Sequence, residues 1–209
     1  MTVKKIEVLE ADMKHLIISV AAYLLGSFCA SIPLSKRVYG KDVRTLGSKN
    51  AGATNVARCF GLKAGLITLL CDMLKTVAAM LFGKLMAGEL GMAIAGAFCM
   101  IGHCFPLYFG FRGGKGVSAG AAVALMQGAG VFLAEMAVFA LIALCTKKAS
   151  VASVCAAISL PIAAWIFGKP PAFIALSLFS CGIVIIMHHG NIKRLLEGTE
   201  PDFRAGKSM

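Results

Sequence analysis

The chain has 209 residues, of which 58% are hydrophobic, and its mean hydropathy is +0.82. Soluble domains are about 45–50% apolar, so this composition excludes an ordinary soluble domain and predicts an integral membrane protein. The formal net charge of +11 would suggest nucleic acid as the partner of a soluble protein. In a membrane protein, such cations line cytoplasmic loops and meet anionic lipid. We therefore expect membrane lipid as a partner, and neither nucleic acid nor an obligate protein partner.

The eight cysteines contain no C-x-x-C pair, and most lie inside apolar runs. They are expected to be small buried hydrophobic residues in a reduced or lipid environment. The acidic residues and histidines do not cluster either. Neither disulfide chemistry, nor a metal site, nor another cofactor is predicted.

The hydrophobic runs predict the spans in chain order. The first run follows three lysines, is long and lacks a signal-peptide cleavage site, so we interpret it as an uncleaved first span. Runs of about 20 apolar residues can cross a bilayer as a helix. Clear spans are predicted at about 15–36, 62–86, 89–108, 150–167 and 171–188. No repeat or soluble linker is visible, so residues 1–209 are expected to form a single transmembrane domain.

The segment Val117–Cys145 decides how many spans there are. It has about 29 residues, which is too long for one untilted crossing. Glycines at 128 and 130 interrupt its middle. The segment is therefore either one tilted helix, which gives six spans, or two helices, which give seven.

The distribution of charge favours seven spans. With seven, 15 of the 21 lysines and arginines face one side, five face the other and Lys75 lies within a span. The positive-inside rule then places the richer side, with the C-terminus, in the cytoplasm. The expected fold class is an all-α integral membrane protein, a seven-span helical bundle. Its fourth span, about 115–127, is short and rich in Gly and Ala, so it must pack inside the bundle.

Three polar stretches, at 47–58, 102–116 and 188–194, lie at the ends of these spans on the predicted cytoplasmic side. Each combines glycine or other small residues with a cation and an amide or hydroxyl. Glycines let backbone N–H groups point at an anion, and cations neutralise it. Together the stretches predict one anion site at a membrane face.

The first stretch contains two glycines, four short polar side chains and Arg58, whose guanidinium can hold a phosphate with two hydrogen bonds. The alternative is an ordinary loop with helix caps. The second stretch places Lys115 among glycines just before a helix, an arrangement that can bind phosphate. The alternative is a flexible hinge with a cytoplasmic lysine. His103, at the start of this stretch, is expected to be packed and hydrogen-bonded, and the alternative is a catalytic histidine.

The third stretch places His188 and Asn191 on one face if it is helical. The alternative is an interfacial helix whose cations reach the headgroups. Within the second span, Asp72 and Lys75 are spaced for a mutual ion pair facing the bundle. Ser150 and Ser153 open the sixth span, either as helix caps or as hydroxyl donors to the anion site.

The three stretches together resemble the bacterial membrane acyltransferases that transfer a fatty acyl group from acyl phosphate to glycerol 3-phosphate. The similar segments are Gly-Ser-x-Asn-x-Gly-Ala-Thr-Asn-Val-x-Arg from Gly47, Gly-His-x-Phe-Pro-x-x-x-x-Phe-Arg-Gly-Gly-Lys-Gly-Val from Gly102, and His-x-x-Asn-Ile-Lys-Arg-Leu-Leu-x-Gly-Thr-Glu from His188. They occur in order over almost the whole chain. Lys49 departs from the glycine usual in the family, His189 from the usual Arg, and Gly190 from the usual acidic residue.

The resemblance implies a seven-span enzyme of the bacterial cytoplasmic membrane whose site faces the cytoplasm. It implies that acyl phosphate binds at the first stretch, through Asn50, Gly52, Ala53, Thr54 and Asn55. It also implies a set of residues that hold glycerol 3-phosphate: Ser48, Arg58, Lys115, Ser153, His188 and Asn191. Four of these, Ser48, Lys115, His188 and Asn191, are the expected catalytic residues. The implied products are lysophosphatidate and phosphate, in the first step of phospholipid synthesis.

An acyl phosphate is already activated, so such an enzyme must align the glycerol hydroxyl, stabilise charge and exclude water. The leading mechanism has no protein nucleophile, and the substrate phosphate accepts the hydroxyl proton. In the second mechanism His188 is the general base. A different class of function, a small membrane transporter of phosphate or a phosphorylated metabolite, could use the same cations. The absence of a repeat and the position of the polar stretches at span ends favour the enzyme.

Overall fold

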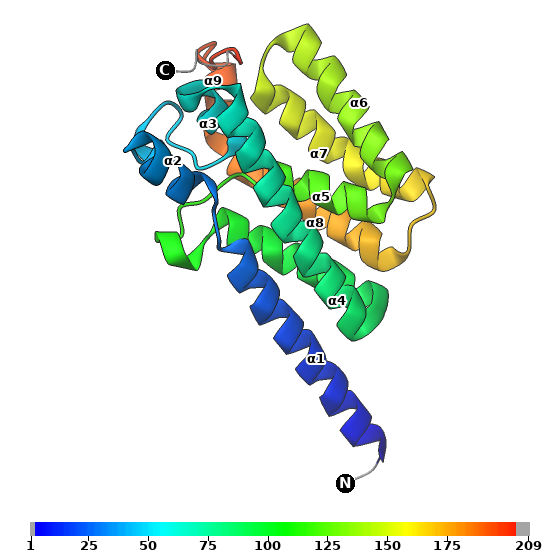
Figure 1. The fold of residues 1–209 in the computed structure, drawn as a ribbon. Helices are drawn as coiled ribbons and strands as arrows, with labels where there is room; N and C mark the ends of the chain where they lie inside the picture. The colour runs from blue at the N-terminus through cyan, green and yellow to red at the C-terminus, as the bar shows by residue number, and fades with distance from the viewer. Residues whose placement is uncertain (1–2, 204–209) are drawn as a thin grey trace.

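The computed structural model describes residues 3–203, which form packed helices without any strand (Figure 1). In a bilayer a helix satisfies its own backbone hydrogen bonds, which is why long apolar runs adopt it. The all-α fold class is therefore confirmed. The helices are α1 (Val3–Gly26), α2 (Ser31–Tyr39), α3 (Ala53–Phe60), α4 (Leu62–Cys104), α5 (Val117–Gln127), α6 (Ala129–Thr146), α7 (Ala149–Ile166), α8 (Pro171–Met187) and α9 (His189–Leu196), with short 3₁₀ turns η1 (Val43–Thr45) and η2 (Leu107–Phe109).

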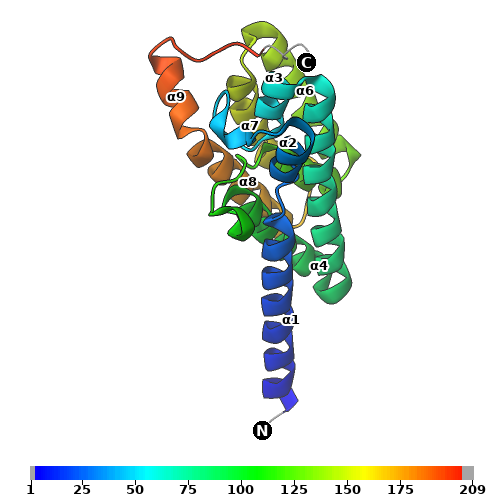
Figure 2. The same ribbon diagram turned by 60° about the vertical axis from the view of Figure 1, so that its left-hand side comes forward.

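The first span differs from the prediction of one helix over 15–36. Helix α1 begins at Val3, projects beyond the other helices at its N-terminal end, and stops at Gly26 (Figures 1 and 2). The chain resumes as the separate helix α2 at Ser31. The break has a tertiary cause, because the Lys75 ammonium on α4 binds the carbonyl oxygens of Gly26 and Phe28 at 2.9 and 2.8 Å.

Helix α4 is a hairpin of two helical halves. Its 43 residues are interrupted at Ala87 and Gly88, where the backbone leaves the helical region and Gly88 has a φ of +59°. The predicted spans at 62–86 and 89–108 correspond to the two halves, although the second ends at Cys104. A Cβ on Gly83 would overlap the backbone of Gly91, so glycine permits the close approach of the halves.

The segment over 117–145 forms two helices, as the seven-span interpretation required. Gly128, with a φ of +126°, separates the 11-residue α5 from α6. Among the described residues, length and composition alone identify four stretches that could cross a membrane, and a fifth if the bent pair α8 and α9 is one span. One of the four is the α4 hairpin, which supplies two crossings, and the short α5 completes seven. The short α5 contacts α4, α6, α7 and α8, inside the bundle as expected.

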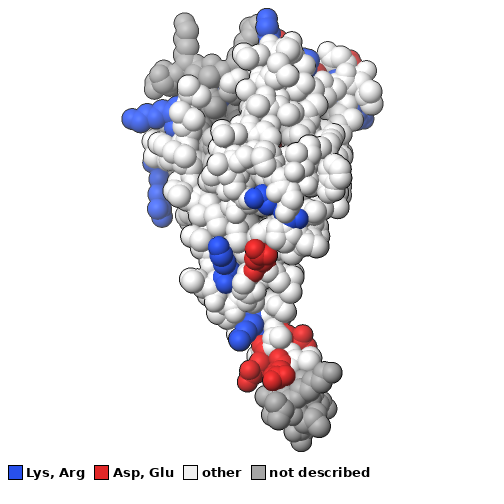
Figure 3. Space-filling model, turned by 90° about the vertical axis from the view of Figure 1, so that its right-hand side faces the viewer, with Lys and Arg blue, Asp and Glu red and all other residues white. Residues whose placement is uncertain are grey.

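The outer surface has the character of a lipid-facing one. Large apolar side chains are widely exposed, including Leu85 (88%), Trp165 (72%) and Ile166 (66%). Most of the face in Figure 3 carries no charged side chain. Exposure of so many large apolar side chains is typical of a surface that contacts lipid, which fits an integral membrane protein. The polar loops after α2, before α5 and around α9 gather at one end of this bundle (Figure 1).

The fold predicts the sidedness of α6. Residues 129 and 148 flank this helix, so single cysteines placed there should be labelled from opposite sides of the membrane. The measurement is maleimide labelling of Ala129→Cys and Lys148→Cys in sealed vesicles, in a chain whose eight native cysteines have been replaced. Labelling of both positions from one side would contradict seven crossings.

Candidate functional site

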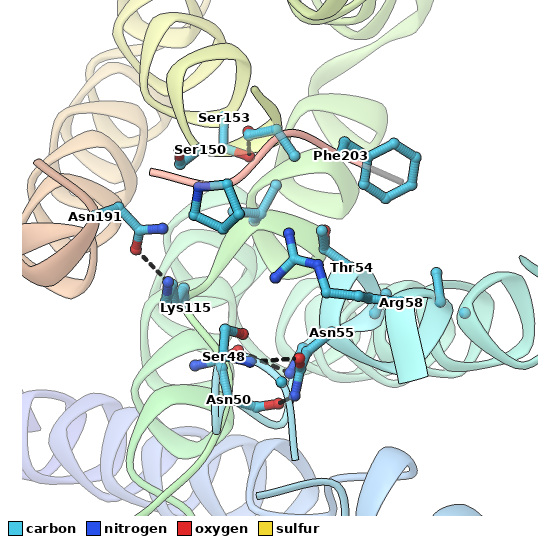
Figure 4. Close-up of a pocket in the computed structure, with 18 of the residues that line it drawn as sticks. Ser48, Asn50, Thr54, Asn55, Arg58, Lys115, Ser150, Ser153, Asn191 and Phe203 are labelled. Carbon is cyan, nitrogen blue, oxygen red and sulfur yellow. Dashed lines mark hydrogen bonds between the residues drawn. The ribbon is translucent and has the colours of Figure 1, made fainter. Parts of the chain in front are cut away.

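A cavity of about 1100 Å³ lies where the three polar stretches meet (Figure 4). The stretches are far apart in the sequence, and helices α3, α5, α7 and α9 bring them to one end of the bundle. The cavity wall contains all of the residues predicted to bind or act on substrate. They are Ser48, Asn50, Gly52, Ala53, Thr54, Asn55, Arg58, Lys115, Ser153, His188 and Asn191.

Asn55 organises the part of the first polar stretch that precedes α3, which we call the first loop. Its side chain is 2% exposed. Its Oδ1 accepts a hydrogen bond from the Ser48 backbone N–H at 2.9 Å, and its Nδ2 donates to the carbonyl oxygens of Val43, Leu46 and Asn50. Because loop backbone occupies both ends of the amide, Asn55 shapes the loop, and its side chain is a poor candidate for a direct phosphate ligand.

Lys49 takes over the backbone role that a glycine would have in this loop. Its φ is +56°, in the left-handed region that favours glycine, and its N–H donates to the Leu46 carbonyl at 2.8 Å. The loop therefore closes despite this departure from the family pattern, at a conformational cost of about 1–2 kcal/mol. In return the cavity wall gains a cation.

Helix α3 points its N-terminus into the cavity. Its N-cap is Gly52, which offers no side-chain cap, and the Gly52 N–H is itself bound by the Asn50 side chain at 2.8 Å. The first amides of a helix lack partners within the helix and carry its positive end. Ala53 and Thr54 provide these amides. A phosphate placed here would complete the helix as a side-chain cap does elsewhere.

Arg58 and Lys115 supply positive charge from two directions (Figure 4). Arg58 lies on α3, and Lys115 reaches from the glycine segment before α5, where its ammonium donates to Asn191 Oδ1. Burial, with the nearby charges of Arg194 and Arg58, lowers the pKa of Lys115 to about 8, although Glu200 opposes this. Positive charge thus outweighs negative charge around the ammonium, and an anionic ligand would redress this imbalance.

His188 directly follows α8, and its imidazole is buried in the cavity wall. Its Nδ1 lies 2.8 Å from the Val184 carbonyl oxygen, which can only accept, so Nδ1 carries the proton in this contact. Nε2 is then available as an acceptor. Burial lowers the pKa of His188 to about 4, with the charge of Lys115 acting in the same direction. A group with so low a pKa is a weak base near neutral pH.

Glu200 has an organising role that the sequence analysis missed. Its Oε1 accepts hydrogen bonds from Ser150 Oγ and Asn191 Nδ2, each at 2.6 Å, and its Oε2 accepts from Arg194 Nε at 2.8 Å. Burial opposes ionisation of this carboxyl, but the three donors hold its pKa below the usual value. The family-like segment that begins at His188 ends on this glutamate, which was the only signal in the sequence.

Neither Ser150 nor Ser153 caps α7, although helix capping was one of the two expectations for them. The N-cap residue of α7 is Lys148, and Ser150 binds Glu200 instead. Ser153 donates to the Ala149 carbonyl at 2.8 Å and lines the cavity. Phe203 also lines the cavity. Its N–H donates to the Lys147 carbonyl at 2.7 Å, which ties the chain after α9 to the residues just before α7. Residues 199–203 therefore form a strap from α9 to the start of α7 (Figure 2).

The chain is similar to known proteins over most of its length. A sequence model of the family described as glycerol-3-phosphate acyltransferase matches residues 16–198. A glycerol-3-phosphate acyltransferase of Syntrophotalea carbinolica is 40% identical over 193 residues, which cover 90% of this chain and 97% of that protein. One of Clostridioides difficile is 42% identical over 192 residues, which cover 89% and 94% of the two chains.

The fold is similar to that of PlsY (YgiH), described as an integral membrane glycerol 3-phosphate acyltransferase. The crystal structure of its glycerol 3-phosphate form superposes with a TM-score of 0.85 at 33% identity, covering 91% of this chain and 96% of that one. The lysophosphatidic acid form gives a TM-score of 0.84 at 32% identity, covering 91% and 95%.

The contacts of Glu200 predict a large effect of its removal. Glu200→Ala leaves Arg194 and two buried donors without their acceptor, so it should destabilise the protein by at least about 2 kcal/mol. Asp202→Ala is the matched control in the same strap. Asp202 pairs with Lys148 at the surface, and such pairs contribute less than about 1 kcal/mol. Thermal unfolding in detergent measures both, and equal losses of stability would contradict the central position of Glu200.

Proposed function

The chain belongs to the glycerol-3-phosphate acyltransferase family, and on that premise we propose that it transfers a fatty acyl group from acyl phosphate to the 1-hydroxyl of sn-glycerol 3-phosphate. The products are lysophosphatidate (1-acylglycerol 3-phosphate) and phosphate, and the reaction is the first step of phospholipid synthesis. The use of acyl phosphate as the donor is the specific part of the proposal.

The observation that carries the proposal is the two-part character of one cavity. At its polar end are the cations and the amides of α3. Its apolar wall consists of Leu62, Gly65, Leu66 and Leu69 of α4 and Phe139, Ala143 and Leu144 of α6. An acyl phosphate has the same two parts, a doubly charged head and an apolar chain. The second phosphate of the reaction, that of glycerol 3-phosphate, accounts for the number of cations.

The two phosphates are assigned to the two sides of the polar end. We assign the acyl phosphate head to the first loop, where Asn50 and Asn55 hold the backbone and Gly52, Ala53 and Thr54 begin α3. We assign glycerol 3-phosphate to a set that surrounds the rest of the cavity. Its members are Ser48, Arg58, Lys115, Ser153, His188 and Asn191.

The chemistry requires alignment more than a strong base. The glycerol oxygen forms a bond to the carbonyl carbon, the bond from that carbon to the phosphate oxygen breaks, and phosphate leaves with the electron pair. The hydroxyl proton passes to a substrate phosphate, so atoms and charge balance without a protein nucleophile. Arg58 and Lys115 stabilise the charge on the departing oxygens, and the apolar wall excludes water. His188 accepts a hydrogen bond from the glycerol portion through Nε2.

We place the enzyme in the bacterial cytoplasmic membrane with the cavity facing the cytoplasm. The cavity end carries most of the lysines and arginines of the loops, which supports this orientation under the positive-inside rule. A cysteine at 148 should therefore be the one labelled from the cytoplasm, and labelling of 148 from outside would reverse the proposed orientation.

The direct test is turnover by the purified protein in detergent. Acyl phosphate and glycerol 3-phosphate should give lysophosphatidate and inorganic phosphate in equal amounts, detected by mass spectrometry and a phosphate assay. Acyl-CoA and acyl carrier protein thioesters serve as comparison donors. Turnover with a thioester but not with acyl phosphate would overturn the choice of donor, and no turnover with any donor would overturn the activity.

The cations of the cavity should dominate catalysis. Arg58→Ala and Lys115→Ala should each lose at least about 1.5–3 kcal/mol of transition-state binding, about 10- to 150-fold in kcat/KM, because each removes a charge-assisted hydrogen bond. Arg58→Lys should also be poor, because a planar fork becomes a point charge. Arg112→Ala, an exposed arginine outside the cavity, is the control and should be unchanged. A kcat/KM near wild type for Lys115→Ala would remove this residue from the site.

His188→Gln separates the two mechanisms. If the histidine only binds substrate, the variant should keep measurable kcat with a raised KM for glycerol 3-phosphate. If it is the base, kcat should fall about 10²- to 10⁴-fold with KM little changed. The low pKa of His188 favours the first outcome. His189→Gln, the exposed neighbour, is the control, and a collapse of kcat in folded His188→Gln at constant KM would make His188 the base.

A further inference from the structure

Three ionisable side chains are buried together at the junction of α1 and α4. Asp72 and Lys75 lie on the first half of α4, and His103 lies near the end of the second half. Their exposed fractions are 1%, 7% and 2%. Burying charge within a membrane protein is costly, so such groups are normally paired or functional. The phosphate-binding roles assigned above use none of the three.

The three side chains form one cluster. Lys75 Nζ lies 2.9 Å from Asp72 Oδ1 and 3.2 Å from His103 Nδ1. His103 Nδ1 lies 3.5 Å from Asp72 Oδ1. The ion pair expected between Asp72 and Lys75 is thus present, and it extends to a histidine on the other half of the hairpin. The cluster therefore fixes the position of the His103 ring relative to the first half of α4.

The cluster also holds the end of α1. The Lys75 ammonium donates to the carbonyl oxygens of Gly26 and Phe28 at 2.9 and 2.8 Å. The last carbonyls of a helix have no partner within that helix, and a cation satisfies them favourably. The same charge thus anchors α1 and both halves of α4 at one point.

The opposite side of the His103 ring faces the glycine segment that carries Lys115. A Cβ added to Gly114 would overlap this ring and lie 2.6 Å from its Cε1. The Gly114 N–H donates to the His103 carbonyl at 3.0 Å, and the Gly113 N–H donates to the Cys104 carbonyl at 3.2 Å. The segment therefore rests directly on His103, whose ring also lines the cavity.

The glycine segment in turn contacts the first loop. The Gly113 carbonyl accepts hydrogen bonds from the Ala51 N–H and from Asn50 Nδ2, both at 3.4 Å. The next cation in the chain is Lys115, which binds Asn191. A continuous set of contacts thus runs from the buried cluster through His103 and Gly114 to both proposed phosphate sites.

We infer that Asp72, Lys75 and His103 are positioning residues of the reaction. They set the position of the Gly113–Lys115 segment relative to α4, and thereby the position of the Lys115 ammonium in the cavity. The inference rests on the proposed role of Lys115 in binding phosphate. The cluster acts through the ring of His103 and does not touch the reacting atoms. Stability alone does not account for it, because replacing a buried ion pair by apolar groups is often neutral.

The first test removes the charges without leaving either one unpaired. The variants are Asp72→Asn/Lys75→Met and, separately, His103→Phe, which keeps a ring under Gly114. Each should raise the KM for glycerol 3-phosphate roughly ten- to a hundredfold, because small displacements of a catalytic group have effects of this size. Inorganic phosphate should raise the Tm of the wild type, and this rise should be lost in both variants. Gly182→Ala, at a helical glycine with open space around it, is the control for both measurements.

The second test uses the contact between Gly114 and His103. Gly114→Ala should raise KM, because its methyl group displaces the ring or the segment. His103→Ala should raise KM too, because it removes the support. In His103→Ala/Gly114→Ala the new methyl group occupies part of the lost ring volume, so the double variant should have a lower KM than either single variant. This rescue is not expected if the residues serve folding alone.

The outcomes distinguish this inference from the proposed function. If wild type lacks turnover, the proposed function fails, and the phosphate-dependent Tm still tests the positioning. Wild-type KM and phosphate response in either the charge-free variant or folded His103→Phe would overturn the inference. Additive KM effects of Gly114→Ala and His103→Ala would overturn it as well, and this comparison remains decisive if the charge-free variant does not fold.

Discussion

The chemistry of the site depends on an excess of positive charge, because several cations that repel one another share one partly apolar cavity. Lys49, Arg58, Lys115, Lys147 and Arg194 line it, and among the described residues of its wall Glu200 is the single carboxylate. The pKa of Lys115 near 8 expresses this imbalance, because its ammonium is buried and has positive neighbours. A site with unbalanced positive charge and open helix amides is suited to anions that carry two charges each. The proposed substrates bring two such phosphates.

Three sets of hydrogen bonds and ion pairs hold the residues of this site in place. Asn55 fixes the first loop, Glu200 ties Asn191 and Arg194 to α7, and the buried cluster at Asp72 supports the glycine segment. Preorganised donors act strongly in a site of low dielectric because they do not have to reorient during the reaction. The bundle contributes by close packing at glycines such as Gly83, which keeps the helices that carry these residues in fixed relation.

Much of this was predictable because it is local in the sequence. Apolar run length gave the spans, charge distribution distinguished seven from six, and each polar stretch carried its own combination of glycine, amide and cation. What escaped prediction depends on distant partners. The stop of α1 at Gly26 needs Lys75, 49 residues away, to bind the freed carbonyls. The role of Glu200 needs Ser150, 50 residues away, and the loop-shaping role of Asn55 needs the folded loop itself. Residue type alone also gave no sign that Ser150 would bind a carboxylate instead of capping its helix.

The most direct test of this account is the number of protons taken up when glycerol 3-phosphate binds. The ligand phosphate is doubly ionised well above its second pKa of about 6, whereas a pKa of about 8 leaves an appreciable part of the Lys115 amine neutral at pH 8. If the ligand anion completes the charge of this site, it raises the pKa of Lys115, and calorimetry at pH 8 in buffers of different ionisation enthalpy should report uptake of up to about half a proton. The uptake should vanish in Lys115→Arg, which stays charged. Binding without proton uptake, or uptake that persists in Lys115→Arg, would contradict the account.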